Sequence, residues 1–428
     1  MASIDLLYIG SILSVGLGVM ALRLVRQNQN LPWNDSIAAQ MICLSFIAKG
    51  ISNACTGLID DADPSSRFFW VCFNLLSETF FSFSMMMLIL IYPITVISSA
   101  KSLKMVSAIL IAFMIGLLII PLTGLFELMP IAGMLLLTTY TVGAIIWGSV
   151  FLKFRLEDSQ SSQNLALLAG LLLVMLAGHQ WFTYPGLFFQ SDYYLFREAF
   201  IFVESSFGNY LWQFSLTAAV GAALMIFSVE VFQASQGKRS VLLYVMSYYI
   251  IAGLLRHFAR VSDDVTLFWD DSLSLYTFTQ TLSIYLQFTI IRPIIAMYIL
   301  LKFQLIRVND ENRKSVKMMS IILIVIATSA VLELIQTFIP INQMISAALL
   351  GVIIAFGIGW EEKSINRLIS SPINCREDAN PEWFPEIELP NNLNKIIMVG
   401  SIIFLVLTII VSYYLWQTGV AEAVMMGG

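Results

Sequence analysis

The sequence predicts an all-α polytopic membrane protein with about twelve transmembrane helices. Of its 428 residues, 58% are hydrophobic and only 12% are charged, and the mean hydropathy is +0.82. Soluble globular domains carry about 25% charged residues, so the composition excludes that class. Apolar runs of about 20 residues recur along the chain and are separated by short polar loops, which is the pattern of helices that cross a bilayer.

Twelve runs have a suitable length and an apolar composition. They cover residues 4–25, 36–59, 68–97, 105–125, 131–152, 165–182, 210–231, 241–258, 274–301, 316–338, 341–359 and 396–416. A span of this length crosses the hydrocarbon core once as a helix. The chain therefore has eleven predicted connections, and their charges can be compared.

The connections alternate in charge. Basic residues follow the odd-numbered spans: Arg23, Arg26, Lys101, Lys104, Lys153, Arg155, Lys238, Arg239, Lys302, Arg307, Arg313, Lys314, Lys317, Lys363, Arg367, Arg376 and Lys395. Acidic or uncharged connections follow the even-numbered spans. Because basic loops stay in the cytoplasm, this bias predicts that both termini lie outside. The protein is expected to be a multi-pass protein of the plasma or cytoplasmic membrane.

Two connections are long. The outer loop, 183–209, is rich in aromatic residues and is expected to lie among the lipid headgroups. The inner loop, 360–395, is polar, contains four prolines and is expected to be an irregular connection without a folded domain. Neither loop carries a nucleic-acid-binding motif, and the bilayer is the partner that the composition predicts.

An internal repeat accompanies the helices. Tyr92-Pro93-Ile94 corresponds to Arg292-Pro293-Ile294, and other short matches follow the same order at an offset of about 200 residues. The pattern predicts two domains, 1–190 and 191–428, each with six helices. An even number of helices gives both repeats the same orientation, and transporters are often built from such repeats. Pro93 and Pro293 are expected to kink corresponding helices and to serve as hinges.

Three ionisable residues lie deep in predicted spans. Lys49 and Glu78 are each eleven residues from a charged residue at the outer end of the span, or about 16 Å along a helix. Arg292 is ten residues from a lysine at the inner end, or about 15 Å. All three positions are near the midplane of a core about 30 Å thick. Lys49 and Glu78 are expected to pair because their spans are consecutive.

The deep charges allow two interpretations. In the first, Lys49, Glu78, Gln287 and Arg292 bind a substrate or a coupling ion, and the substrate is a small polar or anionic solute. In the second, the Lys49–Glu78 pair only fastens two helices together. Arg292 would then donate to carbonyls that the Pro293 kink releases. The sequence leaves both interpretations open.

A second group of polar residues is expected near the outer side. It comprises His179, His257, Arg256, Arg260 and Glu333. These residues could hold a metal or haem, contact a lipid headgroup, or lie singly at the headgroup boundary. None has the spacing of a known metal motif, so the sequence predicts no metal and no cofactor.

These features favour a secondary transporter with a midplane site between the repeats. A non-catalytic subunit, scaffold or receptor that binds other membrane proteins is the alternative. A membrane enzyme that acts at the outer leaflet is the third and least favoured function. No nucleotide-binding loop or catalytic triad pattern supports an enzyme.

Overall fold

The computed structural model describes a helical protein with one short hairpin. The described residues are 2–27, 31–61, 64–123, 130–185, 206–261, 266–267, 270–275, 279, 283, 286–309, 311–338, 373, 381–390 and 392–418. In the hairpin, β1 (Thr266–Leu267) runs antiparallel to β2 (Asp270–Ser274), with Thr266 opposite Ser274. The remainder of the regular structure in these ranges is helical.

The predicted span 341–359 lies outside the described residues, and the described part of 274–301 begins with the last residue of β2 and does not form one continuous helix. The described helices and helical turns cover the other ten predicted spans and part of 274–301. They are α1 (Ala2–Gln27), α2 (Trp33–Asp61), α3 (Pro64–Ile91), α4 (Ala100–Ile119) with the 3₁₀ turn η1 (Ile120–Thr123), α5 (Pro130–Arg155), α6 (Gln160–Trp181), α8 (Ser206–Ser235), α9 (Val241–Val261), the π-helical turn η3 (Leu286–Ile291), α11 (Arg292–Lys302), α12 (Arg313–Phe338), the 3₁₀ turn η4 (Pro381–Trp383) and α14 (Leu393–Gln417). Eight helices among the described residues are long and apolar enough to cross a membrane. This supports an integral membrane protein. The twelve-helix count and the two-repeat arrangement remain predictions.

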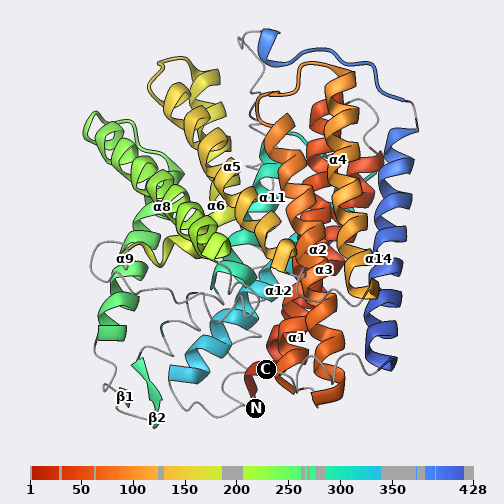
Figure 1. Cartoon of the computed structure of the whole chain (residues 1–428). Helices are drawn as coiled ribbons and strands as arrows, with labels where there is room; N and C mark the ends of the chain where they lie inside the picture. The colour runs from red at the N-terminus through yellow and green to blue at the C-terminus, as the bar shows by residue number, and fades with distance from the viewer. Residues whose placement is uncertain are drawn as a thin grey trace.

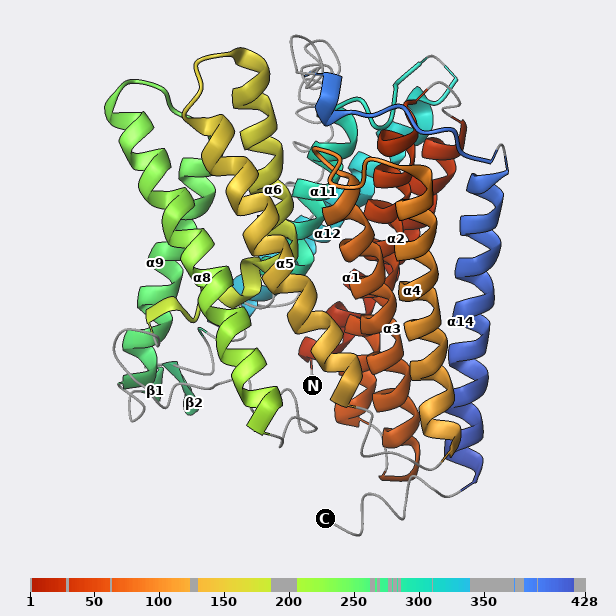
Figure 2. The same ribbon diagram turned by 45° about the horizontal axis from the view of Figure 1, so that its top comes forward.

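The long helices form two groups that meet in the middle of the molecule (Figure 1). One group contains α1 to α4 and α14, and the other contains α5, α6, α8 and α9. Helix α3 contacts α5 where the groups meet, and α11 contacts α6 on one side and α2 on the other. Figure 2 shows α11 and α12 between the two groups. The predicted division of the chain at residue 190 remains a prediction.

Connections that carry basic residues lie at one end of the bundle. The α5–α6 and α8–α9 connections are at this end, which we call the basic end (Figure 1). Helix α1 begins and α14 ends at the opposite end. Successive connections therefore alternate between the basic end and the opposite end of the bundle, as the charges of the loops predict. The side of the membrane that each end faces remains a prediction.

Helix α6 is the most enclosed of the candidate spans. Inside the molecule, 83% of its span is buried, against 22% for the spans in α4 and α14. Its residues 165–178 are apolar on all sides, as expected for a helix surrounded by other helices. Ser159 caps its first turn by accepting a hydrogen bond from the Ser162 backbone amide. Helix α6 thus provides a fixed wall against which α5, α8, α9 and α11 pack.

The two repeated prolines occupy different structural positions, which corrects the expectation of two equivalent kinks. Helix α3 ends at Ile91, and Pro93 follows it in a cis peptide bond after Tyr92. The chain leaves the helix there, so the missing amide of Pro93 interrupts no helical hydrogen bond. Pro293 instead lies in the first turn of α11, directly after the π-helical turn η3. Only Pro293 lies where two helical segments join. The hinge role of both prolines remains a prediction.

The described part of the inner loop crosses the basic end of the bundle. The Thr95 amide donates to the Trp383 carbonyl at 3.0 Å, and Trp33 Nε1 donates to the Pro385 carbonyl at 3.0 Å. The Trp383 ring packs edge-on against Phe154 with centroids 4.6 Å apart. Residues 381–390 therefore connect the ends of several helices. Residues 186–205, most of the predicted aromatic loop, lie outside the described residues.

Candidate functional site

Lys49 on α2 and Glu78 on α3 form an ion pair, as their spacing predicts. The Ser52 hydroxyl, one turn along α2 from Lys49, donates a hydrogen bond to the same carboxylate oxygen of Glu78. Ser52 Oγ also lies 2.7 Å from Asn74 Oδ1. The Lys49 and Glu78 side chains keep 15% and 17% of their exposed area. The pair is therefore largely buried, but its surroundings do not close around it completely.

Arg292 is more deeply buried, with 3% of its surface exposed. Its Nε donates to the Met175 carbonyl at 2.9 Å, and its Nη2 lies 3.4 Å from the Leu176 carbonyl. Both carbonyls belong to α6. The alternative interpretation expected Arg292 to donate to carbonyls released near Pro293, whereas these acceptors come from a neighbouring helix. Arg292 thus connects the start of α11 to the central helix α6.

The Phe81 ring joins the two cationic side chains. The Arg292 guanidinium carbon lies 5.2 Å from its centroid, and Lys49 Nζ lies 5.8 Å from it. Both distances are in the range of a cation–π contact. The charged side chains described around this ring carry two positive charges and one negative charge. We call the group formed by Lys49, Glu78, Phe81, Arg292 and Gln287 the midplane cluster.

Gln287 joins the cluster through η3. The Tyr249 hydroxyl on α9 donates to Gln287 Oε1, and Gln287 Nε2 donates to the Val174 carbonyl of α6 at 3.3 Å. Gly178 permits this approach, since a Cβ there would lie 2.5 Å from the Tyr249 oxygen and 2.7 Å from Gln287 Nε2. Tyr249 and Gly178 could not be selected from the sequence, because a tyrosine and a glycine are ordinary within apolar spans.

His179, a member of the predicted outer group, lies on α6 near both the midplane cluster and Arg256. Its ring packs edge-on against Tyr140, with centroids 5.3 Å apart, and it lies within electrostatic range of Arg292, Lys49 and Arg256. Arg256 is buried on α9, and the joint role of the outer group remains a prediction. His257 is buried on α9 beside Phe258, and the side chains of Arg260 and Glu333 lie outside the described residues. Within the described ranges, no three His, Cys, Asp or Glu side chains gather as metal ligands do.

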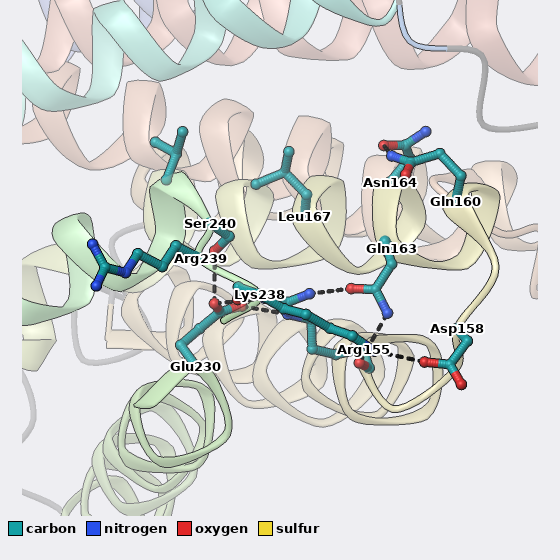
Figure 3. A pocket seen from close by; sticks show the side chains of 11 residues that line it. Arg155, Asp158, Gln160, Gln163, Asn164, Leu167, Glu230, Lys238, Arg239 and Ser240 are labelled. Atoms are coloured by element: carbon teal, nitrogen blue, oxygen red, sulfur yellow. Dashed lines mark hydrogen bonds and ion pairs between the residues drawn. The ribbon is translucent and has the colours of Figure 1, made fainter. Parts of the chain in front are cut away.

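A second polar network lies at the basic end, between α5, α6, α8 and α9 (Figure 3). Arg155 pairs with Glu230 through two bonds, from Nε to Oε1 at 2.7 Å and from Nη2 to Oε2 at 3.0 Å. The Ser240 hydroxyl donates to Glu230 Oε2 at 2.6 Å, and Arg155 Nη2 donates to the Lys238 carbonyl at 3.2 Å. Gln163 accepts a further bond from Arg155. Glu230 is fully buried, so this two-bond pair fastens α5 to α8.

An open pocket of about 490 Å³ surrounds this network. At its rim, Lys238 Nζ donates to Asp158 Oδ1 at 2.6 Å. This hydrogen bond and the charge of Lys238 lower the pKa of the exposed Asp158 carboxyl below its ordinary value. The Arg239 side chain extends away from the other charged groups (Figure 3). The pocket is polar and accessible, whereas the Arg155–Glu230 pair itself is enclosed.

This network was not predicted from the sequence. Arg155 was expected only as one of the basic residues that orient the helices, and Glu230 was not among the candidate residues. The position of Glu230 in the sequence does indicate an ion pair, because it is a carboxylate at the end of an apolar span on the side where basic residues gather. A carboxylate in that position requires a nearby cation when the helix end is buried.

The described part of the chain thus contains two buried charge networks, one at the middle of the bundle and one at its basic end. The basic-end network is internally paired and suits a structural role. The midplane cluster gathers two cations and hydrogen-bonding groups from α2, α3, η3 and α11. No family of known proteins, no curated protein sequence and no solved structure is significantly similar to this chain, so its function must be inferred from these networks.

Proposed function

We propose that this integral membrane protein is a secondary carrier for a small anionic solute, with the midplane cluster as its binding site. One observation carries the proposal: two cations and one carboxylate, from three different helices, meet around Phe81 between the two helix groups. Ionisable groups deep in a membrane protein are unfavourable and usually mark a solute or ion pathway. Carriers commonly bind substrate at this depth beside a discontinuous helix.

The sign of the charges favours an anion. The charged side chains described in the cluster are two cations, Lys49 and Arg292, and one carboxylate, Glu78. The two cations would attract an anionic solute entering the cluster in a medium of low dielectric constant, where such attraction is strong. The planar guanidinium also matches the paired oxygens of a carboxylate, phosphate or sulfate group.

The Lys49–Glu78 pair supplies a group that can change partner. Lys49 can rotate from Glu78 to the solute without leaving α2, because its ammonium is a compact donor on a flexible stem. Within the described part of the chain, Glu78 Oε2 is buried without a hydrogen-bond partner. That oxygen is where a proton would bind once Lys49 moves. The proposed carrier therefore couples anion binding to protonation of Glu78.

The interrupted helix provides the moving element. The π-helical turn η3 and Pro293 separate α11 from the chain that precedes it. Such interruptions weaken the helical hydrogen bonds locally and allow the segments to change angle. Arg292 begins α11, so a change of angle would move the guanidinium relative to α6. Pro293 is the proposed hinge.

The proposal predicts saturable binding of anions that depends on Arg292. We expect carboxylate, phosphate or sulfate salts to raise the thermal unfolding temperature of the purified protein at constant ionic strength. Arg292→Gln removes the charge-assisted bonds and should raise the half-saturating concentration about 30-fold or more. Arg292→Lys keeps the positive charge but loses the planar guanidinium that can donate two parallel hydrogen bonds, and should bind the anion with intermediate affinity. Arg307→Gln, at an exposed arginine, is the matched control and should bind like the wild type.

Two outcomes would contradict the proposal. In the first, none of the anions stabilises the wild-type protein beyond the effect of chloride. In the second, a folded Arg292→Gln protein binds with unchanged affinity. Either result would favour the alternative of a non-catalytic subunit or scaffold, in which the bonds from Arg292 to Met175 and Leu176 only hold α11 against α6.

A further inference from the structure

A groove of about 610 Å³ runs between α14 and the faces of α1, α2 and α3. Its wall is mainly apolar and includes Leu44, Ile47, Phe80, Ile402 and Leu405. Its volume is in the range of ligand-binding pockets. A predominantly apolar groove in a membrane protein suits a hydrocarbon chain better than a polar solute.

Basic residues lie at one end of the groove. Arg23 and Arg26, in the last two turns of α1, line it together with Met398 near the start of α14. Thr408 lines it ten residues further along α14, or about 15 Å at the helical rise. A hydrocarbon core is about 30 Å thick, so the groove extends over about one leaflet. The basic residues are thus at the depth of a headgroup when the apolar wall is at the depth of its acyl chains.

The Arg26 guanidinium lacks a strong acceptor among the described residues. Its Nη1 contacts the Met398 sulfur, and its Nε and Nη2 are buried with no hydrogen-bond partner in the described part of the chain. A thioether sulfur is a weak acceptor, whereas phosphate oxygens form short, charge-assisted bonds with guanidinium groups. The geometry of Arg26 therefore favours an anionic oxygen ligand at the end of the groove.

Helix α14 lies at the edge of the bundle beside this groove. Only 22% of its span is buried, and it packs mainly against α3, where the Phe80 and Phe404 rings stack with centroids 5.5 Å apart. A polar contact joins it to α2 near the basic end, where Gln40 Nε2 donates to Asn394 Oδ1 at 2.8 Å. A molecule in the groove would thus contact α1 and α2 on one side and α14 on the other.

We propose that this groove binds one phospholipid with an anionic headgroup. Its phosphate would lie at Arg26 with Arg23 beside it, and an acyl chain would lie along the apolar wall between α1 and α14. Basic pockets between transmembrane helices are known to bind anionic headgroups. The two guanidinium groups select net negative charge, and the length of the groove selects a hydrocarbon chain over a free anion.

The test is lipid retention by the full-length protein, measured by native mass spectrometry. The probes are phosphatidylglycerol and phosphatidylcholine with identical acyl chains. We expect the wild type to retain one phosphatidylglycerol with at least a tenfold preference over phosphatidylcholine. Arg26→Gln should reduce that preference to less than twofold. Arg307→Gln removes an exposed arginine that does not line the groove, and should leave the preference unchanged.

A second variant and a competition experiment distinguish the contribution of the apolar groove to lipid binding from that of the arginine charges. Ser401→Phe places a large side chain in the groove and should reduce retention of both lipids at least tenfold. Inorganic phosphate at millimolar concentration should not displace phosphatidylglycerol from the wild type. Equal retention of the two lipids, unchanged preference in Arg26→Gln, or displacement by inorganic phosphate would each overturn the proposal. None of these outcomes depends on whether the midplane cluster binds a solute.

Discussion

Replacing Glu230 by Gln is expected to lower the free energy of unfolding by about 3–5 kcal/mol, as for other buried ion pairs that lose one partner. Arg155 would keep its charge in an enclosed position but lose the carboxylate that it contacts at 2.7 and 3.0 Å. Ser240 would also lose a charged acceptor. Denaturant titration in a fixed detergent, with helix content as the signal, measures the change.

The exposed pair in the same pocket provides the control. Lys238 Nζ lies 2.6 Å from Asp158 Oδ1, but the Asp158 side chain is 89% exposed and the Lys238 side chain is 48% exposed. Solvent and salt screen such a pair, so Asp158→Asn should leave stability essentially unchanged. If Glu230→Gln and Asp158→Asn have the same small effect, the Arg155–Glu230 pair does not fasten α5 to α8.

The second large effect is expected at the Lys49–Glu78 pair. Glu78→Met should lower the free energy of unfolding by about 3 kcal/mol, the lower end of the range for buried pairs, because both side chains keep some exposure. The double variant Lys49→Met with Glu78→Met removes both charges and should recover most of the loss. A double-mutant cycle over the four proteins gives the coupling energy.

The same double variant separates a binding role from a structural one. Its stability is expected to approach that of the wild type, whereas its affinity for the anion should fall because Lys49 no longer contributes a positive charge. A folded double variant with wild-type anion affinity would assign the pair to helix packing alone. Additive stability effects would show that Lys49 and Glu78 do not interact.

Local sequence information was sufficient for much of the fold. Hydropathy located the helices because each span must bury its own backbone groups and present an apolar surface, which are local properties. The pairing of Lys49 with Glu78 could also be predicted, since consecutive spans are neighbours and the two residues lie at equal depth. Loop charge predicted the alternation of the connections between the two ends of the bundle.

Contacts between distant spans could not be predicted. Arg292 donates to carbonyls of α6 that lie more than one hundred residues away in sequence. Apolar spans resemble one another, so composition does not specify which of them pack together. The repeated proline motif was misleading for a related reason, because Pro93 follows a helix end while Pro293 joins two helical segments. A short motif does not determine the packing around it.

Current measured on a solid-supported membrane tests the central claim most directly. Proteoliposomes that contain the wild-type protein would be exposed to rapid steps of dicarboxylate, hydrogen phosphate or sulfate concentration, because a doubly charged anion that moves with one proton carries net charge. A midplane anion site predicts a saturable charge movement for at least one of these anions, lost in Arg292→Gln and retained in Arg307→Gln. No saturable signal from the wild type, or the same signal from folded Arg292→Gln, would contradict a midplane anion site.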